Sequence, residues 1–548
     1  MLPGILKKTR FSSYEDLRAN YTINVPENFN FANDVVDKWA NWDEDKLALI
    51  WRNEVGERRE FTFADISKLS KKAANFLVKC GIKKGDKCMF MLGRRWEYWV
   101  CAVAMHRLGA ILIPTSIQMT TKDIAYRVNS AGVKLMLCAD DDYAVEQIRG
   151  AMPQCPTLKT VAVAAGGKRE GFLDLDAEID AASDVFERAD TTNDDIMLLY
   201  FTSGTTGMPK MVAHSFTYPL GQVTTAKFWH QCQDGELHYT ASDSGWAKFG
   251  WGCLYGQWIC GSAILGYEFN HFNAKQMIQV IREERPKTFC VPPTIYRFLM
   301  KEGVTKQDFE SVAHCSTAGE PLSPEIHKEF TAITGLEICE GYGQTESTVL
   351  CGTFDFFKPQ PGSMGKPAPL YDIAVIDANG EPCPIGQEGE LVIRNLDKFC
   401  PPGLLRGYYD EGNIISCYPD GTYHTGDMAW VDEKGYFWFV GRNDDMIKCS
   451  GYRIGPFEIE SVLLTHPAVL ECAITGAPDP IRGQVVKATI VLAKGYEESP
   501  ELTKEIQNYV KKMTAPYKYP RVVEYVKALP KTTSGKISRV MIMTGDKA

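Results

Sequence analysis

The segment from Tyr200 to Lys210 carries residue types whose spacing suits phosphate binding. Its sequence, Tyr-Phe-Thr-Ser-Gly-Thr-Thr-Gly-Met-Pro-Lys, overlaps the end of the apolar run Ile196 to Phe201, which predicts a buried strand. Glycines let the backbone approach a polyanion, hydroxyl groups donate hydrogen bonds, and the lysine adds a positive charge. The candidate phosphate contacts are Thr202, Ser203, Gly204, Thr205, Thr206, Gly207 and Lys210. A proline precedes the lysine and no Ser or Thr follows it, so the segment is not the common P-loop; a solvated turn is the alternative.

Three charged residues further along the chain could complete a nucleotide site. Glu346 follows Thr345, and this hydroxyl and carboxylate are hard oxygen groups suited to an α-phosphate and to Mg²⁺ respectively. Asp427 ends the sequence Tyr-His-Thr-Gly-Asp and can accept hydrogen bonds from ribose hydroxyls. Lys536 ends Thr-Thr-Ser-Gly-Lys near the C-terminus. Taken singly, these residues could equally be a solvated turn glutamate, a turn-capping aspartate and a solvated lysine.

The elements that must position these residues follow an α/β order. Apolar residues recur every three to four positions in 63–77 and 97–108, which predicts helices, and short apolar runs at 87–92, 110–114 and 134–138 predict strands. The same order continues with a predicted strand at 288–292 and a predicted helix at 324–334. Such alternation is typical of a mostly parallel sheet. We therefore expect a large N-terminal domain of mixed and parallel α/β sheets.

The pattern of predicted helices and strands changes twice after this α/β region. From about residue 360 to 440, short strands separated by Gly, Pro and Asp predict a β-rich subdomain. Beyond residue 444, helices and strands return on a small scale, and about 100 residues suffice for a separate α+β domain. We expect domains at 1–443 and 444–548.

Composition limits the classes of protein and partner. The chain has 548 residues, 45% of them hydrophobic, and a formal charge of -9, which argues against a general binder of nucleic acids or anionic membranes. Its 17 cysteines are scattered and odd in number, which fits free thiols in a reducing compartment better than a disulfide framework. Its nine histidines lack the spacing of metal ligands, so the sequence does not predict a histidine metal site. No apolar run reaches the roughly 18 residues that a membrane span needs. The N-terminus does not resemble a secretory signal, and we expect a cytoplasmic protein.

Several short segments rich in glycine, hydroxyl and charged residues follow one another along the chain. They are the phosphate segment and residues 318–322, 340–347, 423–427, 441–448, 451–455 and 530–537. Their order and spacing resemble the adenylate-forming superfamily of acyl-CoA synthetases, firefly luciferase and peptide-synthetase adenylation domains. Within that superfamily the chain looks like the AMP-forming medium-chain acyl-CoA synthetases. The resemblance implies that ATP and Mg²⁺ activate a carboxylic acid to acyl-AMP, with release of pyrophosphate, and that CoA then accepts the acyl group. It leaves the oligomeric state open.

The resemblance also implies roles for individual residues. Lys536, Thr345 and Glu346 would be catalytic, with Lys536 bridging the acyl carboxylate and the α-phosphate and Glu346 holding the metal. Further contacts to ATP or AMP would come from Gly319, Glu320, Pro321, Glu340, Gly341, Tyr342, Gly343, Gln344, Asp427 and Arg442. Tyr342 could instead be an ordinary core aromatic residue.

A mobile C-terminal domain is the next implication of the resemblance. Asp444 lies where family members hinge, and rotation there would exchange the loop of Lys536 for a CoA site. Positions that match CoA contacts are Ser450, Gly451, Tyr452, Arg453, Arg482, Lys511, Tyr519, Pro520 and Arg521. Basic side chains among them suit the phosphates of CoA.

The acyl pocket is expected around Gly343. Acetate-specific relatives carry a tryptophan at this place, so glycine would leave room for a longer or branched acyl chain, while Trp246 and Trp251 would narrow the pocket again. Lys248 either enters the pocket and shortens it or extends to solvent with its stem buried. We expect a short- to medium-chain or branched acid.

Several alternatives remain from the sequence. An aryl-CoA ligase is the nearest one, because tryptophans beside Gly343 could stack an aromatic ring. More distant ones are a carrier-protein-charging adenylation enzyme, a luciferase-like oxygenase and a protein that only binds nucleotide.

Overall fold

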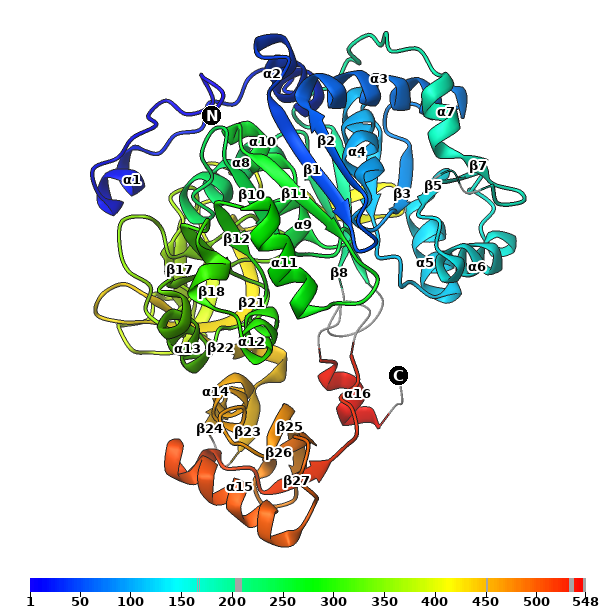
Figure 1. Ribbon diagram of the computed structural model, residues 1–548. Helices are drawn as coiled ribbons and strands as arrows, with labels where there is room; N and C mark the ends of the chain where they lie inside the picture. The colour runs from blue at the N-terminus through cyan, green and yellow to red at the C-terminus, as the bar shows by residue number, and fades with distance from the viewer. Residues whose placement is uncertain (165, 167, 203–208, 450–451, 532–536, 546–548) are drawn as a thin grey trace.

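The structure is a computed structural model that describes residues 1–164, 166, 168–202, 209–449, 452–531 and 537–545, with only the backbone of Arg453. Two nine-stranded sheets form its larger part, and a smaller sheet lies apart at the lower end in Figure 1. The predicted α/β fold class is confirmed. Within the described residues, no helix has the length and apolar character needed to cross a lipid bilayer.

The first sheet carries the strand that precedes the phosphate segment. Its order is β20-β19-β9-β8-β4-β3-β5-β6-β7, parallel from β8 to β7 and antiparallel at β8, β9, β19 and β20. The bounds are β3 Lys87–Met91, β4 Ile111–Pro114, β5 Leu135–Cys138, β6 Thr160–Val163, β7 Leu173–Asp174, β8 Ile196–Thr202, β9 Lys210–Ser215, β19 Gly407–Asp410 and β20 Asn413–Ile415. Central strands such as β4 and β5 are buried throughout, as expected of a parallel sheet covered on both faces.

The second sheet has the order β16-β15-β14-β13-β12-β10-β11-β1-β2 and is parallel from β14 to β1. Its strands are β1 Leu47–Asn53, β2 Arg58–Thr62, β10 Leu237–Thr240, β11 Ala263–Glu268, β12 Thr288–Cys290, β13 His314–Thr317, β14 Ile338–Tyr342, β15 Cys351–Gly352 and β16 Lys366–Pro367. The carboxyl ends of β13 and β14 lead directly into the predicted adenine and magnesium segments.

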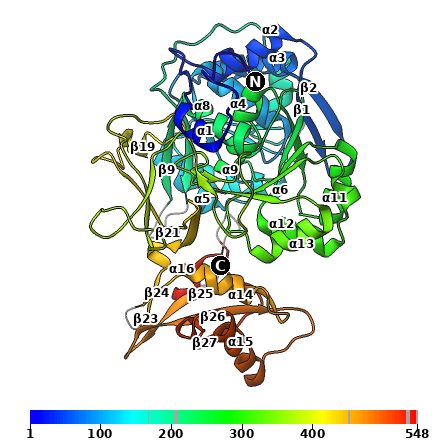
Figure 2. The same ribbon diagram turned by 90° about the vertical axis from the view of Figure 1, so that its left-hand side faces the viewer.

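Helices cover these sheets. A capping box of Thr62 and Asp65 begins α3 (Phe63–Lys79), and α4 (Trp96–Leu108) is buried on every side. Figure 2 shows three further helices grouped on one side of the larger part, opposite β9 and β19. These are α11 Ala274–Glu284, α12 Pro293–Glu302 and α13 Pro324–Thr334. The predicted helix at residues 324–334 has the same bounds in the structure.

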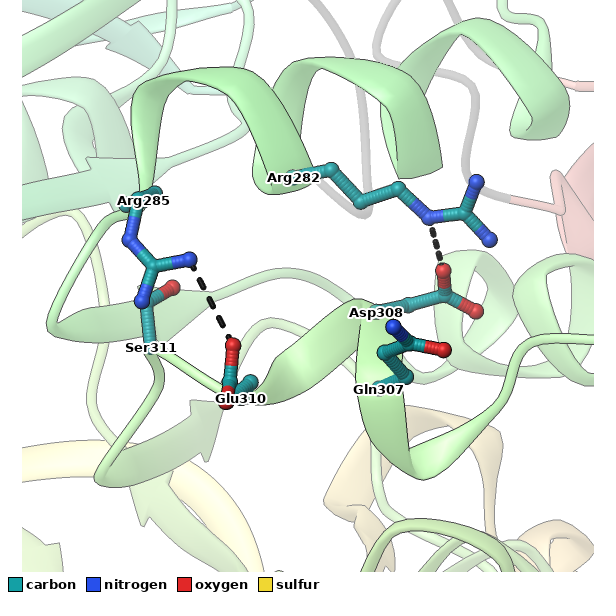
Figure 3. Close-up of a pocket in the computed structure, with 6 residues that line it drawn as sticks. All are labelled: Arg282, Arg285, Gln307, Asp308, Glu310 and Ser311. Carbon is teal, nitrogen blue, oxygen red and sulfur yellow. Dashed lines mark hydrogen bonds and ion pairs between the residues drawn. The ribbon is translucent and has the colours of Figure 1, made fainter.

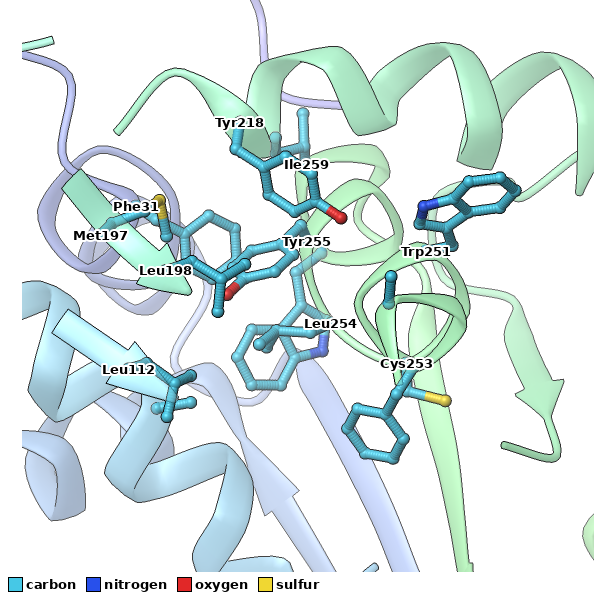
Figure 4. Packing of buried hydrophobic residues seen from close by; sticks show 14 of the residues in the cluster. Phe31, Leu112, Met197, Leu198, Tyr218, Trp251, Cys253, Leu254, Tyr255 and Ile259 are labelled. Atoms are coloured by element: carbon cyan, nitrogen blue, oxygen red, sulfur yellow. The ribbon is translucent and has the colours of Figure 1, made fainter. Parts of the chain in front are cut away.

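An aromatic core packs beside Met197 and Leu198 of β8 (Figure 4). Tyr255, the first residue of α10 (Tyr255–Cys260), lies with its ring centroid 5.1 Å from that of Phe31 and 5.5 Å from that of Tyr218. Tyr218 begins α8 (Tyr218–Val223), and both tyrosines are fully buried. Edge-to-face contacts of this kind add to the stability that apolar burial provides, so α8 and α10 form a firm support for the neighbouring α9 (Ala247–Gly252).

The segment predicted as β-rich contains an antiparallel sheet of β17 (Ile373–Ile376), β18 (Gly389–Ile393), β21 (Tyr423–Val431) and β22 (Phe437–Arg442), in that order. The segment is not self-contained. Strand β16 joins the second nine-stranded sheet, and β19 with β20 extends the first. This sharing brings residues near position 408 beside β9, which the sequence pattern did not predict.

The smaller sheet follows a short 3-10 turn at Asn443–Asp445. It combines β23 (Ile447–Cys449), β24 (Tyr452–Ile454), β25 (Val469–Asp479), β26 (Gly483–Leu492) and β27 (Val522–Tyr525). Its helices are α14 Pro456–Leu463, α15 Pro500–Met513 and α16 Arg539–Thr544. It has its own apolar core, for example Ile459, Ile490 and Ile506. The domain boundary between residues 443 and 444 and the mobility of the C-terminal domain remain predictions.

Candidate active site

The predicted phosphate segment connects two antiparallel strands. Thr202 at the end of β8 stands opposite Lys210 at the start of β9, whereas a P-loop leads from a strand into a helix. The exposed ammonium group of Lys210 lies 5.1 Å from the centre of the Tyr408 ring. The remaining predicted phosphate contacts, Ser203, Gly204, Thr205, Thr206 and Gly207, lie outside the described residues.

Thr345 and Glu346 follow β14 and are held by residues from distant segments. His214 is fully buried, and burial lowers its pKa to about 4, so the neutral ring donates from Nε2 to the Thr345 carbonyl oxygen at 2.8 Å. The Leu405 N–H donates to the Glu346 carbonyl oxygen at 2.8 Å, and the Tyr408 hydroxyl donates to Glu346 Oε1 at 3.1 Å. Motif reasoning identified neither His214 nor Tyr408, because no local sequence signal marks their contact with residues 345–346.

The Glu346 carboxylate fits a magnesium ion that arrives with ATP. Mg²⁺ is commonly held by one or two carboxylates plus substrate phosphates, not by a cage of protein ligands. The described part of the chain holds no group of three or more His, Cys, Asp or Glu that could bind a metal. Burial raises the pKa of Glu346, and the Tyr408 hydroxyl and the Arg442 charge oppose that rise.

Three residues predicted to contact the nucleotide meet around a fourth, Asp427. The Tyr342 hydroxyl donates to Asp427 Oδ2 at 2.5 Å, and Gln344 Nε2 donates to the same oxygen at 2.7 Å. Arg442, directly opposite on β22, places Nε 3.6 Å from Asp427 Oδ1. The Tyr423 hydroxyl fixes the amide of Gln344 by donating to its Oε1 at 3.0 Å. Tyr342 is therefore part of a polar network and not only a core aromatic residue.

The segment predicted to border adenine is tied to β14 by Glu340. The Leu322 N–H donates to Glu340 Oε1 at 3.2 Å, and within the described structure Oε2 has no hydrogen-bond partner. Gly319 and Pro321 lie between Leu322 and the end of β13, and the exposed Glu320 accepts a hydrogen bond from Thr294 Oγ1 at 3.0 Å. Burial raises the pKa of Glu340 to about 8, so this side chain is mostly uncharged at neutral pH.

Replacing Glu340 with glutamine should change how stability depends on pH. The folded protein keeps a proton on Glu340 that the unfolded chain releases above its ordinary pKa of 4.5, so the contribution of this group to stability falls between about pH 4.5 and 8. Glutamine keeps the acceptor for Leu322 and cannot ionise. We expect the variant to gain roughly 1–3 kcal/mol over the wild type at pH 8.5 and little at pH 5. Thermal unfolding of both proteins across this range measures the difference; parallel curves would contradict it.

Two tryptophans pack against glycines at the end of β14: Gly341 lies within the strand and Gly343 directly follows it. A Cβ atom at Gly343 would lie 2.5 Å from Cη2 of Trp251 and 2.6 Å from the Thr348 carbonyl oxygen, and a Cβ at Gly341 would overlap the indole of Trp229. The Trp229 and Trp251 ring centroids are 6.3 Å apart and perpendicular. Trp251 thus fills the room expected beside Gly343. Trp229, which was not among the predicted pocket residues, packs next to Trp251.

Lys248 and Trp246 occupy the start of α9. Trp246 is the half-buried residue before the helix. Lys248 Nζ donates to the Ala318 carbonyl oxygen at 2.8 Å, directly before Gly319. Lys248 therefore does not extend freely into solvent; it links the predicted acyl segment to the predicted adenine segment.

Three of the predicted CoA residues, Lys511, Tyr519 and Arg521, contact one another in the smaller domain. The Tyr519 ring centre lies 3.9 Å from Lys511 Nζ and 4.8 Å from the Arg521 guanidinium, and Arg521 Nη1 donates to the Tyr519 hydroxyl at 2.7 Å. Arg482 and Arg521 both contribute to lowering the pKa of Asp479. The Pro520 carbonyl oxygen accepts from Gln507 Nε2.

The structure describes some, but not all, of the other residues predicted to act in the smaller domain. Tyr452 is exposed and stacks on Tyr517, with ring centroids 4.3 Å apart. Asp444 lies in the 3-10 turn after β22 and lines a cavity of about 30 Å³. Lys536, Ser450, Gly451 and the side chain of Arg453 lie outside the described residues.

Arg539 is a residue of this region that sequence reasoning missed. Its Nη2 donates to both carboxylate oxygens of Glu460, at 2.7 and 2.8 Å, and its Nη1 contacts Asp445 Oδ2 at 3.3 Å. Arg539 begins α16 shortly after Lys536, and Asp445 follows the predicted hinge residue. The triad ties the segment after residue 537 to the predicted hinge.

A separate cleft of about 290 Å³ lies between the C-terminal end of α11 and the 3-10 turn Lys306–Phe309 (Figure 3). Its two arginines are engaged by acids: Arg282 with Asp308, and Arg285 with Glu310 at 3.5 Å. None of the predicted site residues lines it. The cleft is therefore not the candidate site.

Sequence comparison assigns most of the chain to known families. Residues 36–409 match the family described as AMP-binding enzyme, and residues 458–536 match the AMP-binding enzyme C-terminal domain. The mitochondrial acyl-coenzyme A synthetase ACSM3 of Mus musculus is 41% identical over 539 residues, covering 96% of this chain and 92% of that protein. The mitochondrial ACSM5 of Homo sapiens is 41% identical over 527 residues, covering 94% and 90%.

Solved structures of CoA ligases share the fold. An anthranilate CoA ligase, AuaEII, in complex with anthranoyl-AMP superposes with a TM-score of 0.86 at 26% identity, covering 95% of this chain and 98% of that one. An acyl-CoA synthetase of Brucella canis has a TM-score of 0.73 at 30% identity, covering 97% and 98%.

The expected cytoplasmic location is contradicted by these comparisons. The curated relatives are named as mitochondrial proteins, which points to mitochondria instead. The sequence reasoning relied on the order of charges in the first ten residues and on the absence of a secretory signal, and neither feature distinguishes the two compartments.

Proposed function

The chain belongs to the AMP-binding enzyme family and is an ATP-dependent acyl-CoA synthetase, and from this premise we propose that its substrate is a short- to medium-chain or branched carboxylic acid. The acid is first converted to acyl-AMP and pyrophosphate, and CoA then displaces AMP. The observation that carries the nucleotide chemistry is the network in which Tyr342, Gln344, Asp427 and Arg442 meet beside Glu346. The packing of Trp229 and Trp251 beside Gly341 and Gly343 carries the choice of acid.

We assign the nucleotide to this network. Asp427 and Arg442 hold the ribose, the segment 319–321 with Gly341 and Tyr342 borders adenine, and the phosphate segment with Lys210 binds the phosphates that leave as pyrophosphate. Glu346 holds Mg²⁺, which supplies charge neutralisation on the phosphate oxygens when bound. The protein groups keep the α-phosphate in line with the acyl carboxylate, and such positioning is a large part of the rate enhancement in this kind of reaction.

We assign the two steps to two surfaces of the smaller domain. Lys536 offsets the charge that develops when the carboxylate attacks the α-phosphorus. After a rotation at Asp444, the surface of Tyr452, Arg482, Lys511 and Arg521 presents CoA to the acyl-adenylate. The clustering of Lys511, Arg521 and Tyr519 supports this role, because several cations beside an aromatic ring suit a nucleotide with phosphates.

We place the acyl group beside Trp229 and Trp251. The two perpendicular indoles fill the space next to Gly341 and Gly343, so a long unbranched fatty acid would have to displace one of them. A compact or branched chain of roughly three to six carbons suits such an apolar enclosure better, because each added methylene changes binding by about 1–3 kcal/mol in a closed pocket.

An aryl acid is the second candidate. The neighbour AuaEII, solved with anthranoyl-AMP, covers almost the whole chain, and an aromatic ring could stack on Trp251. CoA-dependent release of AMP with butyrate, 2-methylbutyrate, octanoate and benzoate separates the candidates. The highest kcat/KM should belong to butyrate or 2-methylbutyrate; a preference for benzoate would favour the aryl ligase, and a preference for octanoate would contradict the short pocket.

Lys248 offers a test of how the pocket is closed. We expect Lys248→Leu to shift the chain-length optimum towards longer acids by about 3- to 10-fold in relative kcat/KM, because the pocket loses a polar group. The exposed Lys275→Leu on α11 is the control and should leave the profile unchanged. A rise in KM for ATP with an unchanged chain-length profile would show instead that Lys248 only supports the Ala318 segment.

A further inference from the structure

Tyr408 contacts both charged groups at the phosphate end of the site. Its hydroxyl donates to Glu346 Oε1 at 3.1 Å, and its ring centre lies 5.1 Å from Lys210 Nζ. The residue is half-buried and stands on β19, where it pairs with Val212 of β9, two residues beyond Lys210. One side chain therefore touches the cation proposed to bind phosphate and the carboxylate proposed to bind the metal.

The contact belongs to a longer chain of polar groups. The Tyr423 hydroxyl donates to Gln344 Oε1 at 3.0 Å, and Gln344 in turn donates to Asp427 at 2.7 Å. Tyr423 also opposes the rise that burial causes in the pKa of Tyr408. Tyr408 and Tyr423 therefore stand between the proposed phosphate end and the proposed ribose end of the nucleotide site.

The two parts of this side chain act on different partners. The hydroxyl restricts the rotation of the flexible Glu346 carboxylate, since it holds one of the two oxygens. The aromatic face attracts the Lys210 ammonium through the ring quadrupole and limits where this long side chain can lie. The strand pairing of β19 with β9 fixes the ring itself. Both the Glu346 carboxylate and the Lys210 ammonium are therefore held in place before the nucleotide binds.

We propose that Tyr408 is a positioning residue that sets Glu346 and Lys210 for the same Mg·ATP molecule, with the hydroxyl acting on the metal carboxylate and the ring acting on the lysine. This inference rests on the proposed function, because it takes Glu346 as the metal ligand. Groups that hydrogen-bond to a metal ligand typically change metal affinity by about 10- to 100-fold when they are removed.

Two variants separate the hydroxyl from the ring. Tyr408→Phe keeps the ring and loses only the hydroxyl, whereas Tyr408→Leu loses both. Tyr409→Phe is the matched control, because Tyr409 is the next residue of the same strand and its ring contacts Lys87. Binding of α,β-methylene-ATP is measured by calorimetry without metal, and binding of Mn²⁺ to that complex is measured by electron paramagnetic resonance.

Tyr408→Phe should weaken Mn²⁺ binding about 10-fold and leave the metal-free affinity for the nucleotide within about 2-fold. Tyr408→Leu should weaken both, and Tyr409→Phe neither. The transfer of a preformed acyl-AMP to CoA should stay near the wild-type rate in the Phe variant, which excludes a general loss of structure.

An unchanged Mn²⁺ affinity in Tyr408→Phe would overturn the role of the hydroxyl, and a metal-free affinity equal in the Leu and Phe variants would overturn the role of the ring. Failure of the proposed function would look different. The wild type would then show no acid-dependent ATP–pyrophosphate exchange, while the binding measurements would still report on Tyr408.

Discussion

Replacing Lys536 with alanine is expected to reduce acid-dependent ATP–pyrophosphate exchange by on the order of 1,000-fold. In the first step an anionic carboxylate attacks a phosphorus atom that already carries negative oxygens, so a cation placed between them acts mainly on the transition state, and groups of this kind contribute factors of about 100 to 1,000. The second step starts from acyl-AMP and, in the proposed mechanism, uses the CoA-binding residues of the smaller domain instead of Lys536. The rate of acyl-CoA formation from synthetic acyl-AMP should therefore remain near the wild-type value.

Lys531 provides the matched control for Lys536. It lies in the same C-terminal segment, and its Nζ pairs with Glu471 Oε1 at 2.9 Å on the surface of the smaller domain. Lys531→Ala should leave both steps nearly unchanged. An equal loss of both steps in Lys536→Ala would contradict the assignment and indicate a structural role, and normal exchange in that variant would remove Lys536 from the mechanism.

Replacing Trp251 with alanine is expected to reverse the chain-length preference. Its indole occupies the space beside Gly343 and donates from Nε1 to the Ser347 carbonyl oxygen at 3.2 Å. Removing it opens room for several methylene groups, each worth about 10-fold or more in a closed pocket. The ratio of kcat/KM for octanoate to that for butyrate should rise by roughly 100-fold.

The control for this variant must separate substrate selection from stability. Truncation of a buried tryptophan costs about 3–5 kcal/mol, so some loss of thermal stability is expected in Trp251→Ala. Trp258→Phe changes another fully buried indole, on α10, and should lower stability without changing the order of substrates. An unchanged octanoate-to-butyrate ratio in Trp251→Ala would show that the acyl chain does not reach this residue.

The sequence predicted local elements well where the signal is local. The strand before the phosphate segment and the helix Pro324–Thr334 were both expected, because apolar periodicity and helix-breaking residues mark them. The grouping of Tyr342, Gln344, Asp427 and Arg442 agrees with the roles that the family resemblance implied, although those roles stay proposals.

Contacts between distant segments were not predictable in this way. Tyr408 reaches Glu346 only because β19 leaves the β-rich segment and pairs with β9, and no periodicity in residues 407–410 reveals that partner. Trp229 lies beside Gly341 for a similar reason, since it belongs to the π-helix Thr224–Trp229, which runs far from residue 341 in the sequence. Gly343 alone indicated an open pocket, whereas the packing of Trp251 decides how much space exists.

The fate of the carboxylate oxygen tests the central claim most directly. When butyrate labelled with ¹⁸O in both carboxylate oxygens reacts with ATP and CoA, an acyl-AMP intermediate must leave one labelled oxygen on AMP, because the carboxylate oxygen bonds to the α-phosphorus and CoA attack breaks the bond between carbon and that oxygen. Mass spectrometry should find one ¹⁸O per AMP and none in pyrophosphate. Formation of ADP with label in inorganic phosphate would show an acyl-phosphate route and contradict the account.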